Sequence, residues 1–298
     1  MRIALHSKHL AHTTGALVKD LITTLVERHT TLLVSQPLRA QLQEAQASLP
    51  AVQAFGLGED LSNVDLMVSV GGDGTLLEAV NYVGTAAIPI LGINAGRMGF
   101  LATVAHEDAL AAIDLFWQGQ YSIDQRALLQ MTCTAQGKCI APPQHPSTDF
   151  ALNEVALLKR DSSSMIAIRA CIDRELHTTY WADGLMVATP TGSTGYSLSC
   201  GGPVVLPSAC SLVITPINPH NLSVRPLVVP DSAEVSLCVE SRNETFLVAL
   251  DGRSRTTDTE VTLTIRQAPF QAHLVKIGTG NIFDLLRKKL HWGLDVRN

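Results

Sequence analysis

The stretch Val68-Ser-Val-Gly-Gly-Asp-Gly-Thr-Leu-Leu77 decides how the first part of the chain folds. An expected buried strand, Val64–Val70, leads directly into glycines, and helix-like apolar spacing follows over Thr75–Val83. Glycine has no Cβ, so its backbone N–H groups can approach a phosphate closely, and the start of a helix adds partial positive charge. This strand–turn–helix unit predicts an α/β domain whose ligands bind at the carboxyl end of the strand.

Asp73 lies inside this turn, and two interpretations of its carboxylate stay open. One is that the carboxylate only caps the following helix. The other is that it serves a ligand bound in the turn. The chain contains neither a Walker A pattern nor a G-x-G-x-x-G pattern, so the usual P-loop and dinucleotide fingerprints are absent.

Outward from this turn, short apolar strands alternate with helical patterns. Such alternation predicts βαβ units on a parallel, doubly wound, Rossmann-like sheet. The expected strands are Arg2–Leu5, Thr31–Ser35 and Ile88–Ile93, and the expected helices cover Leu17–Val26, Pro37–Ser48 and Glu107–Trp117.

From Tyr121 onward, apolar and polar residues alternate with period two, which predicts an antiparallel β-sandwich. The segment Lys138–Asp149 contains three prolines and is expected to be a loop. We expect strands at Val235–Val239, Phe246–Leu250 and Val261–Ile265, with a hairpin turn at Ser241-Arg242-Asn243 between the first two. The expected division is an α/β domain over residues 1–118, a β-sandwich domain over 119–274, and a helical tail over 275–298 that returns to the first domain.

The composition restricts the classes of partner. Of the 298 residues, 46% are hydrophobic, so a sizeable core can be buried, and only 16% are charged, against a typical value of roughly 25%. The net charge of −5 and the pI of about 6.0 weigh against a nucleic-acid-binding protein, which normally has a basic face. Sparse charge also predicts that part of the surface is buried in a homo-oligomer.

The N-terminus and the cysteines indicate a cytoplasmic protein that is not bound to a membrane. The opening apolar run, Ile3–Leu5, is too short for a signal peptide, and no run approaches the roughly 18 apolar residues that span a bilayer. The 6 cysteines show no zinc-like spacing and are expected to be reduced thiols. His6, His9 and His12 are interpreted as part of a polar loop after the first strand, and no metal ligation by protein side chains is expected.

Three further segments contain candidate ligand-binding residues. A second glycine cluster, Gly92–Leu101, places Asn94 and Arg97 after a strand, but it also fits an ordinary glycine-rich connection. The pair Asn153-Glu154 and the run Asp183–Ser199 are poor in basic residues and rich in acceptors or hydroxyls, which suit ribose, a base edge or phosphate oxygens. A hydroxyl-rich run is also a common loop composition. A serine hydrolase is excluded because the chain has no G-x-S-x-G motif.

Taken together, these segments resemble the NAD kinase family of the bacterial ATP-NAD kinase type. The similarity is carried by Gly71-Gly-Asp-Gly-Thr75, by Asn153-Glu154, and by the run Asp183–Ser199 with its Thr-Pro-Thr-Gly-Ser-Thr-Gly-Tyr-Ser-Leu-Ser motif. The resemblance runs from the opening strand to Leu290–Gly293. It implies an α/β domain followed by a β-sandwich domain that binds NAD and forms the oligomer, a dimer or a tetramer.

The resemblance also implies ATP-dependent phosphorylation of the adenosine ribose 2′-hydroxyl of NAD, which yields NADP. Asp73 would be the proton acceptor, and Mg²⁺ or another divalent ion would arrive with ATP, the phosphoryl donor. The residues expected to bind NAD or ATP by this resemblance are Asp73, Gly74, Asn153, Glu154, Asp183, Thr191, Thr194, Gly195, Tyr196, Ser197, Leu198, Ser199 and Arg253.

Three positions depart from the family pattern. Arg253 lies where relatives often have glutamine, Trp181 where some have arginine, and Glu78 where some have a basic residue. The main alternative is a lipid kinase of the diacylglycerol type, which shares the Gly-Gly-Asp-Gly-Thr turn but needs an apolar acceptor pocket. A non-catalytic dinucleotide sensor and an NAD-dependent oxidoreductase are weaker alternatives, because Asp73 is retained and the dinucleotide fingerprint is missing.

Overall fold

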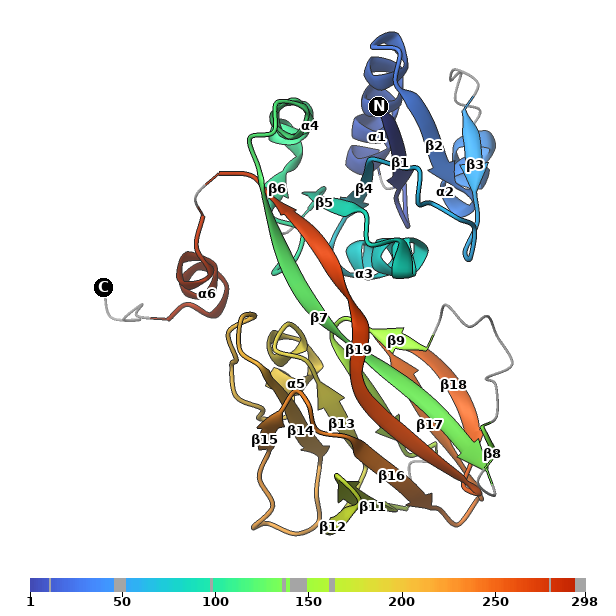
Figure 1. Ribbon diagram of the computed structural model, residues 1–298, viewed down its shortest axis with the longest axis vertical. Helices are drawn as coiled ribbons and strands as arrows, with labels where there is room; N and C mark the ends of the chain where they lie inside the picture. The colour runs from blue at the N-terminus through green and yellow to red at the C-terminus, as the bar shows by residue number, and fades with distance from the viewer. Residues whose placement is uncertain are drawn as a thin grey trace. The chain divides into compact units, whose positions relative to one another are not determined.

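The computed structural model of the chain describes residues 1–10, 12–45, 52–96, 99–135, 138–139, 149–160, 164–278 and 280–292. The chain divides into two compact units (Figure 1): unit 1 comprises Met1–Gln125 and Ala272–Asn298, and unit 2 comprises Arg126–Gln271. The boundaries expected from sequence, after residues 118 and 274, lie a few residues away from these divisions.

Unit 1 is built on a parallel sheet with the strand order β5-β4-β1-β2-β3. Successive residues of β1 and β4 are buried although they point to opposite faces, so both faces of the sheet are covered. The predicted doubly wound α/β arrangement is confirmed. The strands are β1 (Arg2–His6), β2 (Thr31–Ser35), β3 (Gln53–Phe55), β4 (Leu66–Gly71), β5 (Pro89–Asn94) and the short β6 (Val104–Ala105).

The helices of unit 1 bury one apolar stripe each. In the first helix, Val18, Leu21, Ile22 and Leu25 are fully buried at the spacing of one helical face. The predicted helix at Pro37–Ser48 is observed as far as Glu44, and its last expected residues lie outside the described part of the chain. The helices are α1 (His12–Glu27), α2 (Gln36–Glu44), α3 (Asp73–Val83) and α4 (Ala109–Trp117), with 3-10 turns η1 (Gly84–Ala86) and η2 (His106–Asp108).

Two long strands connect the units. The chain leaves unit 1 along β7 (Ser122–Ala135) and returns along β19 (Val261–Lys276), and these two strands pair with each other. The end of β19 then pairs in parallel with β5. The tail continues into helix α6 (Ile282–Leu290), whose first turn is capped by the side chain of Asn281. The predicted return of the C-terminal tail to the first unit is therefore observed.

Unit 2 consists of two sheets. One has the order β12-β11-β16-β19 and includes β7, and the other has the antiparallel order β15-β14-β13-β10-β17-β18. Its strands and short helices are β8 (Lys138–Cys139), β9 (Phe150–Ala151), β10 (Glu154–Leu158), β11 (Ile166–Ile172), β12 (Glu175–Ala182), β13 (Gly184–Ala188), η4 (Gly192–Thr194), α5 (Tyr196–Ser199), β14 (Ser211–Ile217), β15 (Leu227–Pro230), β16 (Val235–Glu240), β17 (Thr245–Leu250) and β18 (Arg253–Asp258).

The core of unit 2 lies between these two sheets. Alternate residues of each strand contribute to one buried cluster, such as Leu237 and Val239 from β16 and Phe246 and Val248 from β17. This is the packing of a β-sandwich, with hydrophobic residues on the inner faces and polar residues outside. The period-two alternation in the sequence therefore predicted both the fold class and the buried residues correctly.

The predicted hairpin at Ser241-Arg242-Asn243 is wrong. The strands on either side of it, β16 and β17, belong to different sheets. The hairpin that forms is β17–β18, whose two-residue turn is Asp251-Gly252 with Leu250 opposite Arg253. Both turn residues have positive φ, 48° and 79°, as a type I′ turn requires. Asp-Gly is a stronger hairpin signal than Ser-Arg-Asn, which explains why the hairpin forms here.

The proline-rich segment expected to be a loop lies mostly outside the described residues. Of the range Lys138–Asp149, only Lys138–Cys139, which form β8 opposite Ala135 and Thr134, and Asp149 are described.

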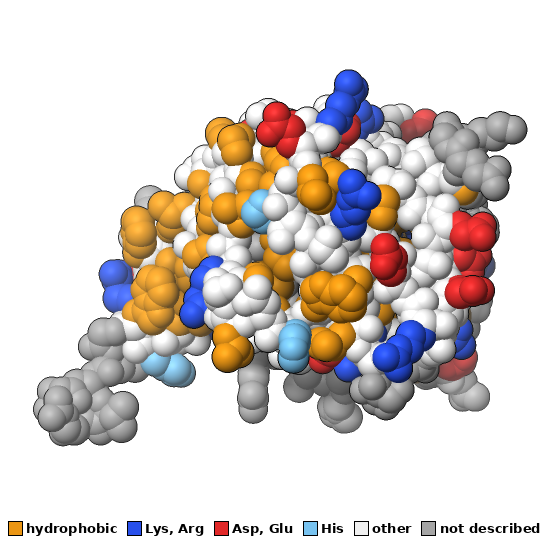
Figure 2. Space-filling model, turned by 90° about the horizontal axis from the view of Figure 1, so that it is seen from below, with side chains coloured by type: hydrophobic (Ala, Val, Ile, Leu, Met, Phe, Trp, Pro, Cys, Tyr) orange, Lys and Arg blue, Asp and Glu red, His pale blue; other side chains and the backbone are white. Residues whose placement is uncertain are grey.

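Large hydrophobic side chains are exposed at several places in unit 2. Trp181 is 56% exposed and Leu222 is 86% exposed. On the face drawn in Figure 2, hydrophobic side chains form several groups with few Lys, Arg, Asp or Glu side chains among them. The other large hydrophobic residues exposed in unit 2 are Met165, Leu176, Tyr196, Leu206 and Val228.

Among the described residues, no helix combines the length and the apolar character needed to cross a bilayer.

A pair of substitutions on β16 tests the inner and outer faces of the sandwich. Leu237→Ala removes a fully buried side chain and should lower the free energy of unfolding by roughly 2–5 kcal/mol. Ser236→Ala lies on the opposite face, where its hydroxyl is 3.4 Å from Thr264 Oγ1, and should cost about 1 kcal/mol or less. Urea unfolding followed by circular dichroism measures both values, and equal losses would contradict the assignment of faces.

Candidate functional site

The Gly-Gly-Asp-Gly turn lies at the carboxyl end of β4, as predicted. Gly71 ends the strand with a φ of +156°, and a Cβ there would lie 2.3 Å from Thr75 Oγ1, so no larger residue fits. Gly72 precedes the first residue of α3, Asp73, and its carbonyl accepts hydrogen bonds from the N–H groups of Thr75 and Leu76. The turn therefore passes directly from strand to helix.

The carboxylate of Asp73 does not cap its own helix. Oδ2 accepts a hydrogen bond from the N–H of Phe100 at 2.7 Å, and Oδ1 accepts from Leu101 at 3.0 Å and from Ala102 at 3.1 Å. The N-cap position of α3 is Gly72, and no side chain caps the helix. The capping interpretation of Asp73 is therefore wrong, since this carboxylate binds a segment that follows β5.

The second glycine cluster lies beside the first. In the parallel pair β4–β5, Gly71 lies opposite Asn94, and the N–H of Ala95 bonds to the carbonyl of Gly71. Asn94 Oδ1 accepts from the N–H of Gly96 at 2.7 Å. The cluster is therefore part of the same strand-end region, as the functional interpretation of Asn94 expected. Arg97 lies outside the described residues.

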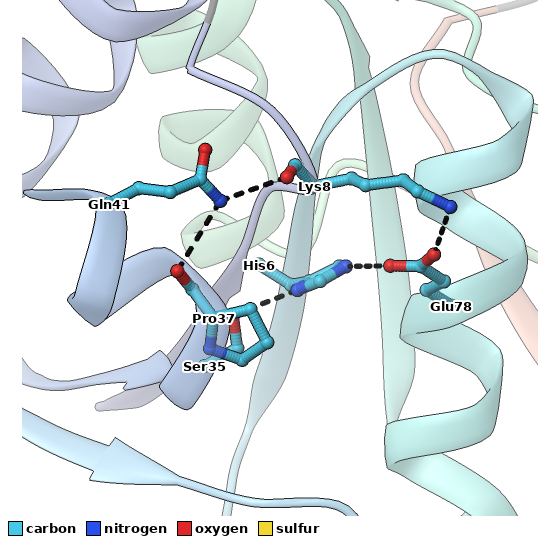
Figure 3. A network of polar contacts seen from close by, with 6 residues as sticks. All are labelled: His6, Lys8, Ser35, Pro37, Gln41 and Glu78. Carbon is cyan, nitrogen blue, oxygen red and sulfur yellow. Dashed lines mark hydrogen bonds and ion pairs between the residues drawn. The ribbon is translucent and has the colours of Figure 1, made fainter.

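Glu78 belongs to a polar network that fixes α3 to the end of β1 (Figure 3). His6 Nε2 lies 3.2 Å from Glu78 Oε2, His6 Nδ1 lies 2.8 Å from Ser35 Oγ, and Lys8 Nζ lies 2.5 Å from Glu78 Oε1. Because a carboxylate only accepts, the proton of neutral His6 is assigned to Nε2. The hydrogen bond from His6, together with Lys8, lowers the pKa of Glu78 to about 2 in spite of partial burial.

This network corrects the interpretation of the three early histidines as one polar loop. His6 is the last residue of β1 and is fully buried, whereas His9 is exposed and His12 opens α1. A buried histidine at the end of a strand is accommodated because both of its ring nitrogens have polar partners. Among the described residues, no group of three or more His, Cys, Asp or Glu is arranged to hold a metal ion.

In unit 2, a second aspartate holds the segment that contains Asn153 and Glu154. Asp251 Oδ2 accepts from the N–H of Leu152 at 2.7 Å, and Oδ1 accepts from Asn153 at 2.7 Å and from Glu154 at 3.2 Å. The N–H of Asp251 bonds in return to the carbonyl of Glu154. Asp251 is not among the site residues expected from the sequence, although its position in the Asp-Gly turn is a usable signal.

Glu154 lies in an environment that disfavours its ionised form. Burial, and next the negative charge of Asp251, raise the pKa of Glu154 to about 7. Its Oε2 is buried and has no hydrogen-bond partner in the part of the chain that the structure describes. A shifted pKa together with an unpartnered oxygen is typical of a residue that binds a ligand or takes part in chemistry.

The hydroxyl-rich run packs closely against Asn153. The N–H of Thr189 bonds to the carbonyl of Asn153 at 2.9 Å, and a Cβ at Gly192 would lie 2.1 Å from that same carbonyl oxygen. An added Cβ at Gly195 would lie 3.4 Å from Glu154 Oε2 and 3.6 Å from Asn153 Nδ2. The structure therefore places the segment from Thr189 to Gly195 against Asn153 and Glu154.

Several hydroxyls of this run already have partners within unit 2. Thr191 Oγ1 accepts from Arg126 at 3.1 Å, Thr194 Oγ1 donates to the carbonyl of Thr191, and Ser197 Oγ lies 2.9 Å from Thr215 Oγ1. Thr191 and Ser197 are buried, whereas Tyr196 is 42% exposed and Ser199 is also exposed. Gly195 and Leu198 are partly buried. The part of the run that follows β13, residues 189–199, is therefore a loop stabilised by hydrogen bonds of its own hydroxyl groups. Only some of its side chains are exposed.

Asp183 lies at the other end of β13 from this loop. Leu158 pairs with Gly184 and Glu154 pairs with Ala188, so four strand residues, or roughly 13 Å, separate the two ends. Asp183 binds Lys159 at 2.6 Å and Asn218 at 3.2 Å. The pKa of Asp183 is lowered, and the hydrogen bond from Lys159 is the main cause. Burial raises the pKa of Tyr196, and the charges of both Asp183 and Glu154 contribute.

The two remaining unusual positions lie in different surroundings. The guanidinium of Arg253 donates to the carbonyl of Phe150 at 2.5 Å and to that of Leu250 at 3.1 Å, so it joins β18 to the segment before Asn153. Trp181 is on β12 opposite Ala167, and its side chain is mostly exposed.

Family models match most of the chain. A model described as the ATP-NAD kinase N-terminal domain matches residues 8–121, and one described as the ATP-NAD kinase C-terminal domain matches residues 152–277. A Cytophaga hutchinsonii protein named NAD kinase is 42% identical over 299 residues and covers 100% of both chains. A Bacteroides fragilis NAD kinase is 48% identical over 239 residues, 80% of each chain.

Solved structures also match. The crystal structure of yeast NADH kinase complexed with NADH has a TM-score of 0.84 at 23% identity, and the match covers 99% of this chain and 89% of that one. At that identity the likeness shows the fold alone. The crystal structure of an NAD kinase from Archaeoglobus fulgidus in complex with ATP has a TM-score of 0.64 at 28% identity, covering 93% and 94% of the two chains.

The raised pKa of Glu154 makes stability depend on pH. Between pH 4.5 and 7 the unfolded chain releases this proton while the folded chain keeps it, so wild-type stability falls as the pH rises. Glu154→Gln removes the titrating carboxyl group. The free energy of unfolding of this variant, relative to that of wild type, should therefore increase from pH 5 to pH 8 by up to roughly 3 kcal/mol. Urea unfolding at several pH values measures the change.

Glu78→Gln is the matched control. Since the pKa of Glu78 is lowered to about 2, its stabilising contribution is complete above the unfolded value of 4.5 and is lost only as the pH falls toward 2. The stability difference between Glu78→Gln and wild type should therefore stay nearly constant between pH 5.5 and 8. A Glu154→Gln difference that is equally constant would contradict the assigned environment of Glu154.

Proposed function

The chain belongs to the NAD kinase family, and we propose on that basis that it transfers the γ-phosphoryl group of ATP to the adenosine ribose 2′-hydroxyl of NAD, yielding NADP. The observation that carries this function is that family models for both ATP-NAD kinase domains match in order, over residues 8–121 and 152–277. Full-length relatives named NAD kinase support the same reaction. The lipid-kinase alternative has no such support.

Asp73 is the proton acceptor of this reaction. Phosphoryl transfer needs little covalent help from a protein, which must mainly orient the acceptor hydroxyl and stabilise charge. A carboxylate within hydrogen-bond reach of the 2′-hydroxyl orients it and takes its proton as the new oxygen–phosphorus bond forms, while the bond between the γ-phosphorus and the β–γ bridging oxygen breaks and ADP leaves. The location of Asp73 at a strand-to-helix turn, where α/β proteins bind ligands, supports this role, as does Gly74 beside it with an N–H group in the first turn of α3.

The residues gathered around Asn153 in unit 2 bind NAD. Asn153 and Glu154 offer an amide and a carboxyl group to ribose or base, and Gly195 lies against both. Tyr196 and Ser199 supply an exposed ring and hydroxyl, and Thr194 and Leu198 are partly exposed beside them. Thr191, Ser197 and Arg253 support this binding surface through the contacts described above. Asp183, between β12 and β13, is assigned to this surface by the family resemblance.

Mg²⁺ or another divalent ion is expected to arrive bound to the phosphates of ATP. Mg²⁺ commonly keeps several waters and binds to proteins through one or two carboxylates together with substrate phosphates. The described residues offer no cluster of three ligands for it. When bound, it would supply the neutralisation of phosphate charge.

Unit 2 is also the proposed site of assembly into a homodimer or homotetramer. The low charge content of 16% and the exposed hydrophobic side chains of unit 2 support this assignment. A cytoplasmic location is supported by the free thiols of Cys171, Cys200, Cys210 and Cys238.

Incubation of the purified chain with Mg·ATP and NAD tests the proposed function. NADP should form and is detected with an NADP-specific dehydrogenase. If NADP forms neither with ATP nor with another phosphoryl donor such as polyphosphate, the proposal is wrong.

Asp73→Asn tests the role of the proton acceptor. The variant keeps the size of the side chain but loses its basicity, so kcat should fall by at least about a hundredfold. NAD binding, measured by calorimetry, should persist. A variant with wild-type kcat would show that Asp73 is not the base.

Asp251→Ala tests whether the Asn153–Glu154 segment binds NAD. Loss of the carboxylate leaves three N–H groups without their acceptor, and a cost of about 1–3 kcal/mol in NAD binding corresponds to a rise in its KM of roughly 5- to 100-fold. Asp251→Asn retains one acceptor oxygen and should have a smaller effect. Asp258→Ala, at the exposed end of β18, should leave KM unchanged; an equal rise in both alanine variants would contradict the assignment.

A further inference from the structure

Gly99 lies directly against the carboxylate of Asp73. A Cβ built on Gly99 would lie 1.8 Å from Asp73 Oδ1, 2.3 Å from Cγ and 2.6 Å from Oδ2. These distances are far below any van der Waals contact, so a side chain at position 99 and the observed position of the carboxylate exclude each other. This close approach accounts for the need for glycine at position 99.

The approach of Gly99 is what allows the next three residues to bind the carboxylate. The N–H groups of Phe100, Leu101 and Ala102 point at the two oxygens from 2.7 to 3.1 Å. Hydrogen bonds from backbone amides to a charged acceptor are among the stronger neutral–ion contacts in proteins. Because the donors are backbone atoms of a segment that follows β5, they hold the carboxylate without the rotational freedom of a side-chain partner.

Three donors leave the carboxylate with acceptor capacity to spare. An ionised carboxylate has about four acceptor positions on its two oxygens. From the residues that the structure describes, Oδ1 accepts two hydrogen bonds and Oδ2 accepts one, so these donors leave one position on Oδ2. A hydroxyl that approaches Asp73 can therefore bond to Oδ2 while the three amides keep the group in place.

We propose that Gly99 is a positioning residue of the phosphoryl-transfer reaction: its lack of a side chain lets the N–H groups of residues 100–102 orient the carboxylate of Asp73 so that one lone pair of Oδ2 receives the proton of the acceptor hydroxyl. This inference rests on the proposed role of Asp73 as the base. The orientation of a catalytic base is worth a large factor in rate, since a displacement of about 1 Å can cost on the order of a hundredfold.

Gly99→Ala is the direct test. Alanine keeps the backbone N–H groups but its methyl group forces the Asp73 carboxylate away from the loop. The kcat for NADP formation should fall about 10- to 100-fold, whereas the KM values for NAD and ATP should stay within about twofold of wild type, because the substitution displaces the base rather than the bound substrates.

Gly96→Ala is the matched control. Gly96 belongs to the same glycine cluster, has no positive φ, and an added Cβ would meet no atom of the described residues beyond its chain neighbours within 4 Å. Its kcat and KM values should remain close to wild type. Equal losses of kcat in both variants would mean that any change in this cluster disturbs the enzyme, and would overturn the proposal.

A second readout does not depend on activity. Amide hydrogen exchange in the full-length protein should accelerate at Phe100, Leu101 and Ala102 in Gly99→Ala, because these N–H groups lose the carboxylate, and should remain slow in Gly96→Ala. Unchanged exchange at these three amides in Gly99→Ala would show that the carboxylate has not moved, and would overturn the proposal.

The double variant Gly99→Ala/Asp73→Asn separates this proposal from the proposed function. If Gly99 acts through Asp73, the double variant should be no slower than Asp73→Asn alone. A further loss equal to that of Gly99→Ala would show that Gly99 acts independently, while Asp73 remains the base. Wild-type kcat in Asp73→Asn would instead overturn the role of Asp73, and the catalytic role of Gly99 with it.

Discussion

In each unit, one aspartate carboxylate accepts hydrogen bonds from three successive backbone N–H groups of a distant segment. Asp73 holds residues 100–102 and Asp251 holds residues 152–154. Irregular segments outside helices and sheets must find partners for their N–H groups, because a buried donor left unpaired costs about 1–3 kcal/mol. A single carboxylate meets this need for three residues at once. The backbone of residues 100–102 and of residues 152–154 is therefore held by hydrogen-bond acceptors that lie elsewhere in the chain.

The elements of unit 1 could be predicted because their patterns are local. Parallel strands covered on both faces are continuous apolar runs, as in Leu66–Val70, and α1 shows its buried stripe directly in the spacing of Val18, Leu21 and Leu25. The 3-residue strand β3 was missed because so short a segment carries no period. In unit 2 the alternation identified which residues of β16 and β17 face the core, but it could not identify their partners. Period two specifies the face of a strand and leaves its neighbours undetermined.

The candidate site shows the same limit at the level of single side chains. The sequence identified the carboxylates and hydroxyls by type, and the structure places the segment from Thr189 to Gly195 against Asn153. The sequence could not show which hydroxyls are already bonded. Ser197 is paired with Thr215, which lies 18 residues further along the chain. The pairing of Asp73 with residues 100–102 likewise joins segments that no periodic pattern connects. Such contacts follow from the adjacent ends of β4 and β5, and therefore from the fold.

The path of the chain makes the folding of the two units interdependent. Unit 2 is one continuous segment, Arg126–Gln271, whereas unit 1 is completed only when β19 returns and pairs with β5 at His273 and Leu274. While unit 2 is unfolded, the two parts of unit 1 are ends of a loop longer than a hundred residues, and closing such a loop costs about 4 kcal/mol of chain entropy. During synthesis the ribosome must therefore release the whole sandwich before the first sheet can acquire its final strand. Unit 1, whose synthesis begins first, therefore completes its fold last.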